Sequence, residues 1–318
     1  MREAISAPLQ GGRSGPGKGR LKRLRDAMIY AVVAALVAVL TALPRRLAEA
    51  ACRGLGAIAY VILGRARRAV RARLCAGLGA ARVPERRVRA SFAAMGSTLA
   101  DTLALLREGE RASRSLAMDD ASRAVFRAAL EEGRGVVYVA AHLGSWERMA
   151  ALLVEEGFPV AAVARASNDP RLTRLYERIR APRGVRSIYR GTPGASVAIA
   201  RELVRGRAVG FLVDLPARVP CARAPLFGEE ADVPIGAARI ALARRAAVVV
   251  GTATKASGRG ATVVIARVRS DDLAPGPAGE AELLGRLARV LDDRIAAWPE
   301  AWLGLFVPPR LQGADVPR

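Results

Sequence analysis

Gly135-Val-Val-Tyr-Val-Ala-Ala-His-Leu-Gly-Ser-Trp-Glu147 carries the signals of a strand, a turn and a helix start in that order. The apolar run Val136 to Val139 is rich in β-branched residues, which is typical of a short buried strand. From Trp146 onward apolar residues recur with helical spacing, and Gly157 marks the end of that helix. The segment therefore predicts one strand–turn–helix unit of an α/β sheet.

The single histidine of the chain, His142, falls where this strand passes into the helix. Catalytic groups of α/β sheets usually lie at the carboxyl ends of strands. A helix N-terminus favours neutral imidazole, the form that a general base needs. Glu147, five residues later, can accept a hydrogen bond from the ring and fix its tautomer. The alternatives are a structural histidine and a glutamate that only places a favourable charge in the first helical turn.

Strands and helices alternate along the rest of the chain, with Asp119 and Asp120 placed to cap a helix rather than to act as an acid–base pair. The alternation predicts one α/β domain, residues 64–310, with a mixed sheet flanked by helices, in which the last two strands pair antiparallel. A Pro-rich loop is expected between Asp214 and Val233. The expected strands are Ser115–Met118, Val136–Val139, Pro159–Ala164, Val185–Tyr189, Ala208–Val213, Val248–Thr254 and Thr262–Val268, and the expected helices are Pro84–Glu108, Ala121–Glu132, Trp146–Gly157, Pro170–Arg180, Thr192–Arg205, Pro234–Arg245 and Glu280–Trp298.

The N-terminal region predicts a membrane anchor. Residues 1–26 are polar and basic, and we expect a disordered arm there. Ala27 to Leu43 carries no charge, and a helix of that length covers about 25 Å, slightly less than a hydrocarbon core of about 30 Å. An amphipathic helix, Leu47 to Leu63, follows, so residues 27–63 form either a weak span or an interfacial anchor. A secretory signal is the competing interpretation, and residues 311–318 are expected to form a tail.

Composition limits the partners and the chemistry. The net charge of +22, from 51 basic and 29 acidic residues, favours an anionic partner such as lipid headgroups, nucleic acid or an acidic carrier protein. Aromatic residues make up only 4% of the chain, so nucleic acid is disfavoured. The three cysteines form no CxxC motif, and with one histidine they offer no zinc ligand set, so neither a metal nor a cofactor is expected. Reduced cysteines and the basic flank of the anchor favour the cytoplasmic side.

The segment His142-Leu-Gly-Ser-Trp-Glu147 resembles the His-x4-Glu/Asp motif of the lipid A late acyltransferases, the lauroyl and myristoyl transferases of the wider glycerolipid-acyltransferase-like group. Three further blocks resemble family segments and occur in the family order: Arg165-Ala-Ser-Asn-Asp-Pro-Arg-Leu172, Gly210-Phe-Leu-Val-Asp214, and Leu226-Phe-Gly-Glu-Glu-Ala-Asp-Val-Pro-Ile-Gly236 with its helix at Ile240-Ala-Leu-Ala243. The chain departs from the pattern at Leu215, after the Asp, and in a C-terminal Trp segment reduced to Trp298 and Trp302.

The resemblance implies a glycerolipid-acyltransferase-like fold at the cytoplasmic face of a bacterial inner membrane. It also implies late acylation of a lipid A precursor, an anionic glycolipid, with acyl carrier protein as donor. A hydroxyl is a poor nucleophile, and His142 is the only imidazole that can take its proton. The expected catalytic residues are His142 and Glu147, and the expected substrate-binding residues are Arg165 for a phosphate or the oxyanion, Asp214 to hold an arginine, the backbone N–H groups of Gly144 and Ser145 for the oxyanion, and Arg178 for a lipid phosphate. Arg190 could bind a lipid phosphate in the same way, and the alternative for both Arg178 and Arg190 is a solvated surface position.

Two alternatives stay open from the sequence. One is acylation of another membrane lipid, such as a phosphatidylinositol mannoside or an aminolipid, with acyl-CoA in place of acyl carrier protein as donor. The other is a non-catalytic, membrane-anchored protein that binds an anionic polymer, in which His142 is structural.

Overall fold

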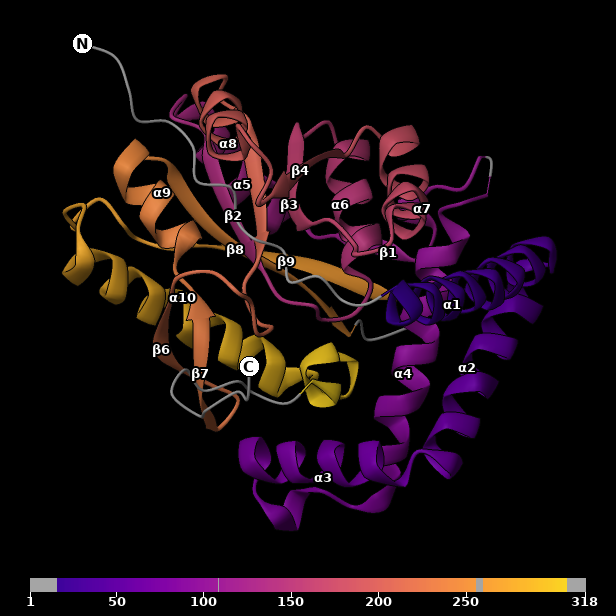
Figure 1. Cartoon of the computed structure of the whole chain (residues 1–318). Coiled ribbons are helices and arrows are strands. Elements are labelled where there is room, and N and C mark those ends of the chain that lie inside the picture. Colours follow the sequence, from indigo (N-terminus) through magenta and orange to yellow (C-terminus); the bar gives the residue numbers. More distant parts are fainter. Residues whose placement is uncertain (1–15, 108, 256–259, 308–318) are drawn as a thin grey trace.

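The strand that precedes His142 lies in the middle of a seven-stranded sheet. The computed structural model describes residues 16–107, 109–255 and 260–307, and the structural statements that follow refer to these residues (Figure 1). Strand β2 (Val136–Ala140) is buried over its whole length. It pairs in parallel with β5 (Ala208–Leu212) on one side and with β8 (Ala247–Lys255) on the other. Burial on both faces explains why the strand is a continuous apolar run.

The sheet has the order β1-β9-β8-β2-β5-β3-β4. Strand β9 pairs antiparallel with β8, as the sequence predicts for the last two strands, and β1 pairs in parallel with β9. Strands β1 and β9 therefore run opposite to the other five, and the fold is the expected mixed α/β sheet flanked by helices. The remaining strands of the sheet are β1 (Leu116–Met118), β3 (Val160–Arg165), β4 (Arg186–Arg190) and β9 (Ala261–Arg267).

Alternate residues of β2 contribute to two different cores because successive side chains of a strand point to opposite faces. Val137 and Val139 pack in the core that holds α8 (Ala195–Val204), α9 (Gly236–Arg244) and α10 (Pro277–Ala297). Val136 and Tyr138 pack in the core on the other face, which three further helices cover. These are α5 (Asp120–Glu131), α6 (Trp146–Glu155) and α7 (Pro170–Arg180), and Asp119 caps α5 as predicted.

Four helices precede the sheet: α1 (Pro16–Ala42), α2 (Arg45–Ile62), α3 (Gly64–Leu78) and α4 (Glu85–Ala104). Helices α2 and α4 approach each other closely at two glycines. A Cβ atom on Gly56 would collide with the carbonyl oxygen of Phe92, and one on Gly96 would collide with the carbonyl oxygen of Cys52. Arg107, just beyond α4, donates hydrogen bonds to the carbonyl oxygens at the end of α1. The four helices are therefore packed against each other and are not a flexible leader.

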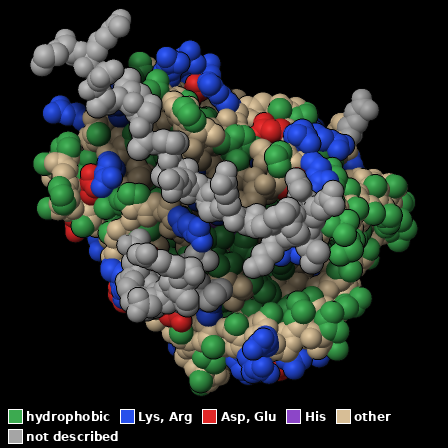
Figure 2. Space-filling view, in the orientation of Figure 1, with side chains coloured by type: hydrophobic (Ala, Val, Ile, Leu, Met, Phe, Trp, Pro, Cys, Tyr) green, Lys and Arg blue, Asp and Glu red, His purple; other side chains and the backbone are tan. Residues whose placement is uncertain are grey.

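Helix α1 contains a stretch that is long and apolar enough to cross a membrane. Leu24–Ala42, 19 residues, has a mean hydropathy of 1.9, and only 6% of it is buried, although a signal sequence has the same properties. Apolar side chains gather over α1 on the molecular surface (Figure 2). The prediction of a disordered arm is wrong for residues 16–26, since α1 begins at Pro16. Residues 1–15 of that arm, and the predicted tail at 311–318, lie outside the described residues.

The expected Pro-rich loop contains an antiparallel hairpin, β6 (Cys221–Leu226) and β7 (Glu229–Pro234). Phe227 and Gly228 form its turn, and both have positive φ angles, 53° and 75°. Two consecutive positive φ angles are typical of the tight hairpin turn that matches strand twist. The prediction missed this hairpin because prolines mask its strands, and it also missed α3, which turns 94° away from α2.

Candidate active site

His142 and Asp214 meet because β2 and β5 are neighbours in register. Ala140 lies opposite Leu212, so the residues two positions further along each strand reach the same level. The ring Nδ1 of His142 lies 2.8 Å from Oδ1 of Asp214. The backbone N–H of His142 donates to Oδ2 of the same carboxylate over 2.9 Å. Asp214 thus fixes both the ring and the main chain of the histidine.

Trp302 completes the environment of this carboxylate. Its indole Nε1–H donates to Oδ2 of Asp214 over 2.8 Å, and both side chains are buried. Burial acts to raise the pKa of Asp214, but the charge of His142 and the hydrogen bonds from His142 and Trp302 outweigh it and lower that pKa. Leu303 donates its backbone N–H to the His142 carbonyl oxygen over 2.9 Å. The segment around Trp302 therefore holds the turn after β2 in place, a role that its sequence did not reveal.

Glu147 does not orient the histidine, which corrects the expectation from the sequence. Its carboxylate accepts two hydrogen bonds from Arg180 on α7, with distances of 2.8 and 2.6 Å. The two side chains are 4% and 10% exposed. Burial acts to lower the pKa of Arg180, but the hydrogen bonds and charge of Glu147 raise it. Asp214 takes the place at the ring that was expected for Glu147, and its hydrogen bonds go to His142 and Trp302 instead of to an arginine.

The amide of Gly144 is used differently from the expectation. Gly144 has a φ of 62° and donates its N–H to the Ala301 carbonyl oxygen over 3.0 Å, so this N–H is not free for an oxyanion. The Ser145 hydroxyl donates to Asp101 over 2.6 Å. Neither residue is among those that line the adjacent cavity. Trp146 does line it, and its ring packs edge-on against the His142 ring at 5.0 Å between centroids.

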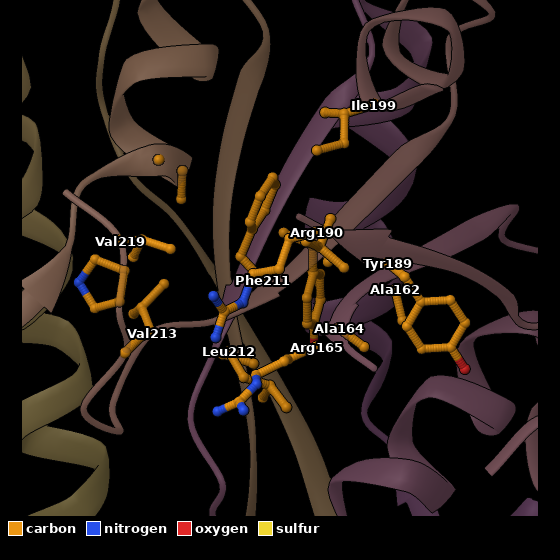
Figure 3. Close-up of a pocket in the computed structure, with 18 of the residues that line it drawn as sticks. Ala162, Ala164, Arg165, Tyr189, Arg190, Ile199, Phe211, Leu212, Val213 and Val219 are labelled. Atoms are coloured by element: carbon orange, nitrogen blue, oxygen red, sulfur yellow. The ribbon is translucent and has the colours of Figure 1, made fainter. Parts of the chain in front are cut away.

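A cavity of about 940 Å³ opens beside His142. Its walls are mainly apolar and come from β3, β4 and β5 and from helices α8 and α9. Figure 3 shows the lining residues of the three strands and Ile199 of α8. The polar side chains in the wall include those of Arg165, Arg190 and Tyr189. Among the apolar residues that line it are Ala162, Val163, Ile199, Phe211, Leu212 and Val219.

The predicted site residues are thus only partly brought together. His142, Glu147 and Arg165 line the cavity, and Asp214 lies behind His142. Arg178 does not line it and instead borders a separate groove between α1 and α7. Among the described residues, no three histidine, cysteine or acidic side chains are grouped in a way that could hold a metal ion.

The arrangement suits proton transfer next to an apolar binding space. A buried carboxylate at Nδ1 directs the other ring nitrogen away from itself, and His142 borders the cavity. A comparison with curated proteins found no match. A comparison with protein families matched residues 16–307 to the bacterial lipid A biosynthesis acyltransferases. That match covers nearly the whole chain and agrees with the resemblance seen in the sequence, and the chain belongs to the bacterial lipid A biosynthesis acyltransferase family.

Proposed function

We propose that this acyltransferase moves a fatty acyl chain from the thioester of acyl carrier protein to a hydroxyl of a lipid A precursor, with His142 as the general base. The hydrogen bond of 2.8 Å between His142 Nδ1 and Asp214 beside a large apolar cavity is the observation that carries this proposal. It supplies the two things that the reaction needs, which are a base for the hydroxyl and room for an acyl chain.

Asp214 accepts the Nδ1–H of His142, so the lone pair of the ring lies on Nε2. Nε2 takes the proton of the acceptor hydroxyl as its oxygen attacks the thioester carbonyl carbon. The C–O bond then forms and the C–S bond breaks, and the imidazolium returns its proton to the leaving thiolate. Asp214 stabilises the transient positive charge on the ring, as the acid of a catalytic triad does.

Glu147 acts in this proposal as a positioning residue. Its pair with Arg180 joins the first turn of α6 to the last turn of α7, so it keeps the start of α6 in place beside the cavity. Arg165 remains a candidate for contacting the substrate, since it lines the cavity. Arg178 borders the separate groove between α1 and α7, not this cavity, and is proposed only as a lipid contact near α1.

The membrane placement belongs to the same proposal. The exposed apolar side chains of α1, with Met28, Val32 and Val39 each more than half exposed, support insertion into a bilayer. The excess of arginine supports attraction to anionic lipid and to an acidic carrier protein. We place the catalytic body at the cytoplasmic face of the bacterial inner membrane, where acyl carrier protein occurs.

The test is the substitution His142→Ala in the full chain, reconstituted in lipid vesicles with an acylated carrier protein and a lipid A precursor. Loss of the base should lower kcat by about 10²- to 10⁴-fold. Mass spectrometry of the lipid product measures the added acyl chain. The matched control is Arg201→Ala, an exposed residue of α8 outside the cavity, which should keep wild-type activity.

The donor and the acceptor are tested in the same assay. Acyl-CoA replaces the acylated carrier in one arm, and other membrane lipids, a phosphatidylinositol mannoside or an aminolipid, replace the acceptor in another. Faster transfer from acyl-CoA or onto another lipid would correct the substrate assignment. Equal acyl transfer by wild-type protein and His142→Ala would remove the general base from the proposal. No transfer by either, with lipid binding retained, would favour the non-catalytic binder.

A further inference from the structure

Arg165 and Arg190 lie side by side at the edge of the cavity. They are register partners on the parallel strands β3 and β4, at the carboxyl end of each strand. Adjacent strands are about 4.8 Å apart, so two side chains at partnered positions can reach one ligand together. Figure 3 shows both side chains extending toward the same part of the cavity, near Leu212.

These two arginines differ from two others that line the cavity. Arg180 is bound to Glu147 at 2.6 Å, and Arg239 is bound to Glu280 at 3.0 Å. Arg165 donates only to the amide oxygen of Asn168, at 3.0 Å. No described side chain forms a hydrogen bond or an ion pair with the guanidinium of Arg190. The pair thus places two positive charges next to each other without a carboxylate to balance them.

An arrangement of this kind is unfavourable in the empty site. Like charges directly opposite each other on neighbouring strands destabilise a sheet. Burial lowers the pKa of Arg190, and the charge of Arg165 lowers it further. Arg244 also lines the cavity without an ion pair, but it lies in the last turn of α9, where helix carbonyls balance a positive charge. Arg165 and Arg190 have no such compensation within the described residues.

The chemistry of the site indicates which anion would bind. A guanidinium is planar and presents parallel N–H donors, which match the oxygens of a phosphate. An acyl thioester carries no charge and so cannot balance two arginines. Both proposed substrates bring a phosphate ester, however: the acceptor on its sugar, and the donor on the pantetheine arm of the carrier.

We propose that Arg165 and Arg190 together bind a phosphate ester of a substrate and thereby position that substrate against His142. This inference rests on the proposed acyl transfer. It assigns Arg165 to phosphate binding and not to the oxyanion, and it places Arg190 with Arg165 at one and the same phosphate.

The kinetic test uses Arg165→Gln and Arg190→Gln in the full chain, with Arg201→Ala as the control. Each Gln variant should raise the KM for the phosphate-bearing substrate by about 10- to 100-fold, the loss expected for one charge-assisted hydrogen bond, with a smaller effect on kcat. The source of the phosphate is found by removing it from one substrate at a time. One arm uses a dephosphorylated acceptor glycolipid, and the other compares S-acyl-pantetheine with S-acyl-4′-phosphopantetheine.

The phosphate that occupies the site is the one whose removal impairs the wild-type enzyme but has little further effect on the Gln variants. If removing the phosphate from either substrate raises the KM of the Gln variants as much as that of the wild type, Arg165 and Arg190 do not bind a substrate phosphate. A fall in kcat for Arg165→Gln that is independent of phosphate on either substrate would return Arg165 to the oxyanion and overturn the pair.

A binding test without turnover separates this inference from the proposed function. Inorganic phosphate should raise the thermal unfolding midpoint of the wild-type protein above that in chloride of equal ionic strength, because a ligand of the folded state stabilises it. Arg190→Gln should lose this shift while unfolding no earlier than the wild type, since a like charge has been removed. An equal shift in both proteins would refute the site even if acyl transfer is established. If the wild-type protein is inactive with every donor, the proposed acyl transfer is refuted. The shift of the unfolding midpoint by inorganic phosphate then still tests whether Arg165 and Arg190 bind phosphate.

Discussion

Asp214 and Glu147 are both buried carboxylates beside the turn between β2 and α6, but their partners differ in kind. Asp214 contacts an imidazole ring, which can gain and lose a proton, and that ring borders the cavity. Glu147 contacts the guanidinium of Arg180, which stays protonated and forms a two-point pair. Glu147 shares a short sequence motif with His142, but this proximity in sequence does not make it a catalytic partner of the histidine. The titratable group opposite it decides whether it can serve proton transfer.

The largest expected effect is on stability, at Glu147. Glu147→Ala leaves the buried guanidinium of Arg180 without its partner, and removing one member of a buried pair costs about 3–5 kcal/mol of unfolding free energy. Urea unfolding in detergent, followed by circular dichroism, measures the change. The double substitution Glu147→Ala with Arg180→Met should recover part of the loss, because no unpaired charge remains. A stable Glu147→Ala protein that is as inactive as His142→Ala would break the comparison.

The next effect is on turnover, at Asp214. Asp214→Asn keeps a side chain of the same size but no longer fixes the ring tautomer, so we expect kcat to fall by about 10²-fold. Steady-state rates with saturating donor and acceptor measure it. The control is Asp293→Asn on the exposed side of α10, which should leave kcat unchanged. Wild-type turnover in Asp214→Asn would show that the carboxylate holds the backbone of His142 and nothing more.

The smallest effect is on acid stability. The folded-state pKa of Asp214 lies below its ordinary value of 3.8, so its contribution to stability is complete above that pH. The contribution is lost as the pH falls below 3.8 through the folded-state pKa, by about 1.4 kcal/mol for each unit of the difference. Unfolding free energies of wild type and Asp214→Asn, compared from pH 6 down to pH 3, give the difference due to this group. If the difference in unfolding free energy between the two proteins does not become smaller toward pH 3, the Asp214 carboxylate does not make this pH-dependent contribution.

Much of the fold follows from local sequence. The β-branched run before His142 and the helical spacing after Trp146 locate β2 and α6, and the alternation of strands and helices indicates the sheet. The sequence did not predict the hairpin of β6 and β7, because its strands contain Pro225 and Pro234, and proline is unusual within strands.

The site was less predictable for a physical reason. The 72-residue separation between His142 and Asp214 is bridged only because β5 inserts between β2 and β3, and no local pattern specifies that strand order. Glu147, by contrast, is close in sequence to the ring, which made it the obvious partner. Arg180, a charged helix residue, gave no signal that separated it from the many other arginines of the chain.

The close contact of α2 and α4 at Gly56 and Gly96 has a consequence for how the enzyme meets its substrate. Carbonyl oxygens of one helix occupy the space where side chains of the other would begin, so the two helices cannot slide past one another without losing the fit. Helix α1 leads directly into α2, and Arg107 donates hydrogen bonds to the carbonyl oxygens at the end of α1. The anchor is therefore rigidly attached to the rest of the protein and is not a flexible tether. If α1 lies in a bilayer, as we propose, this rigid packing would hold His142 at a set height above the lipid surface.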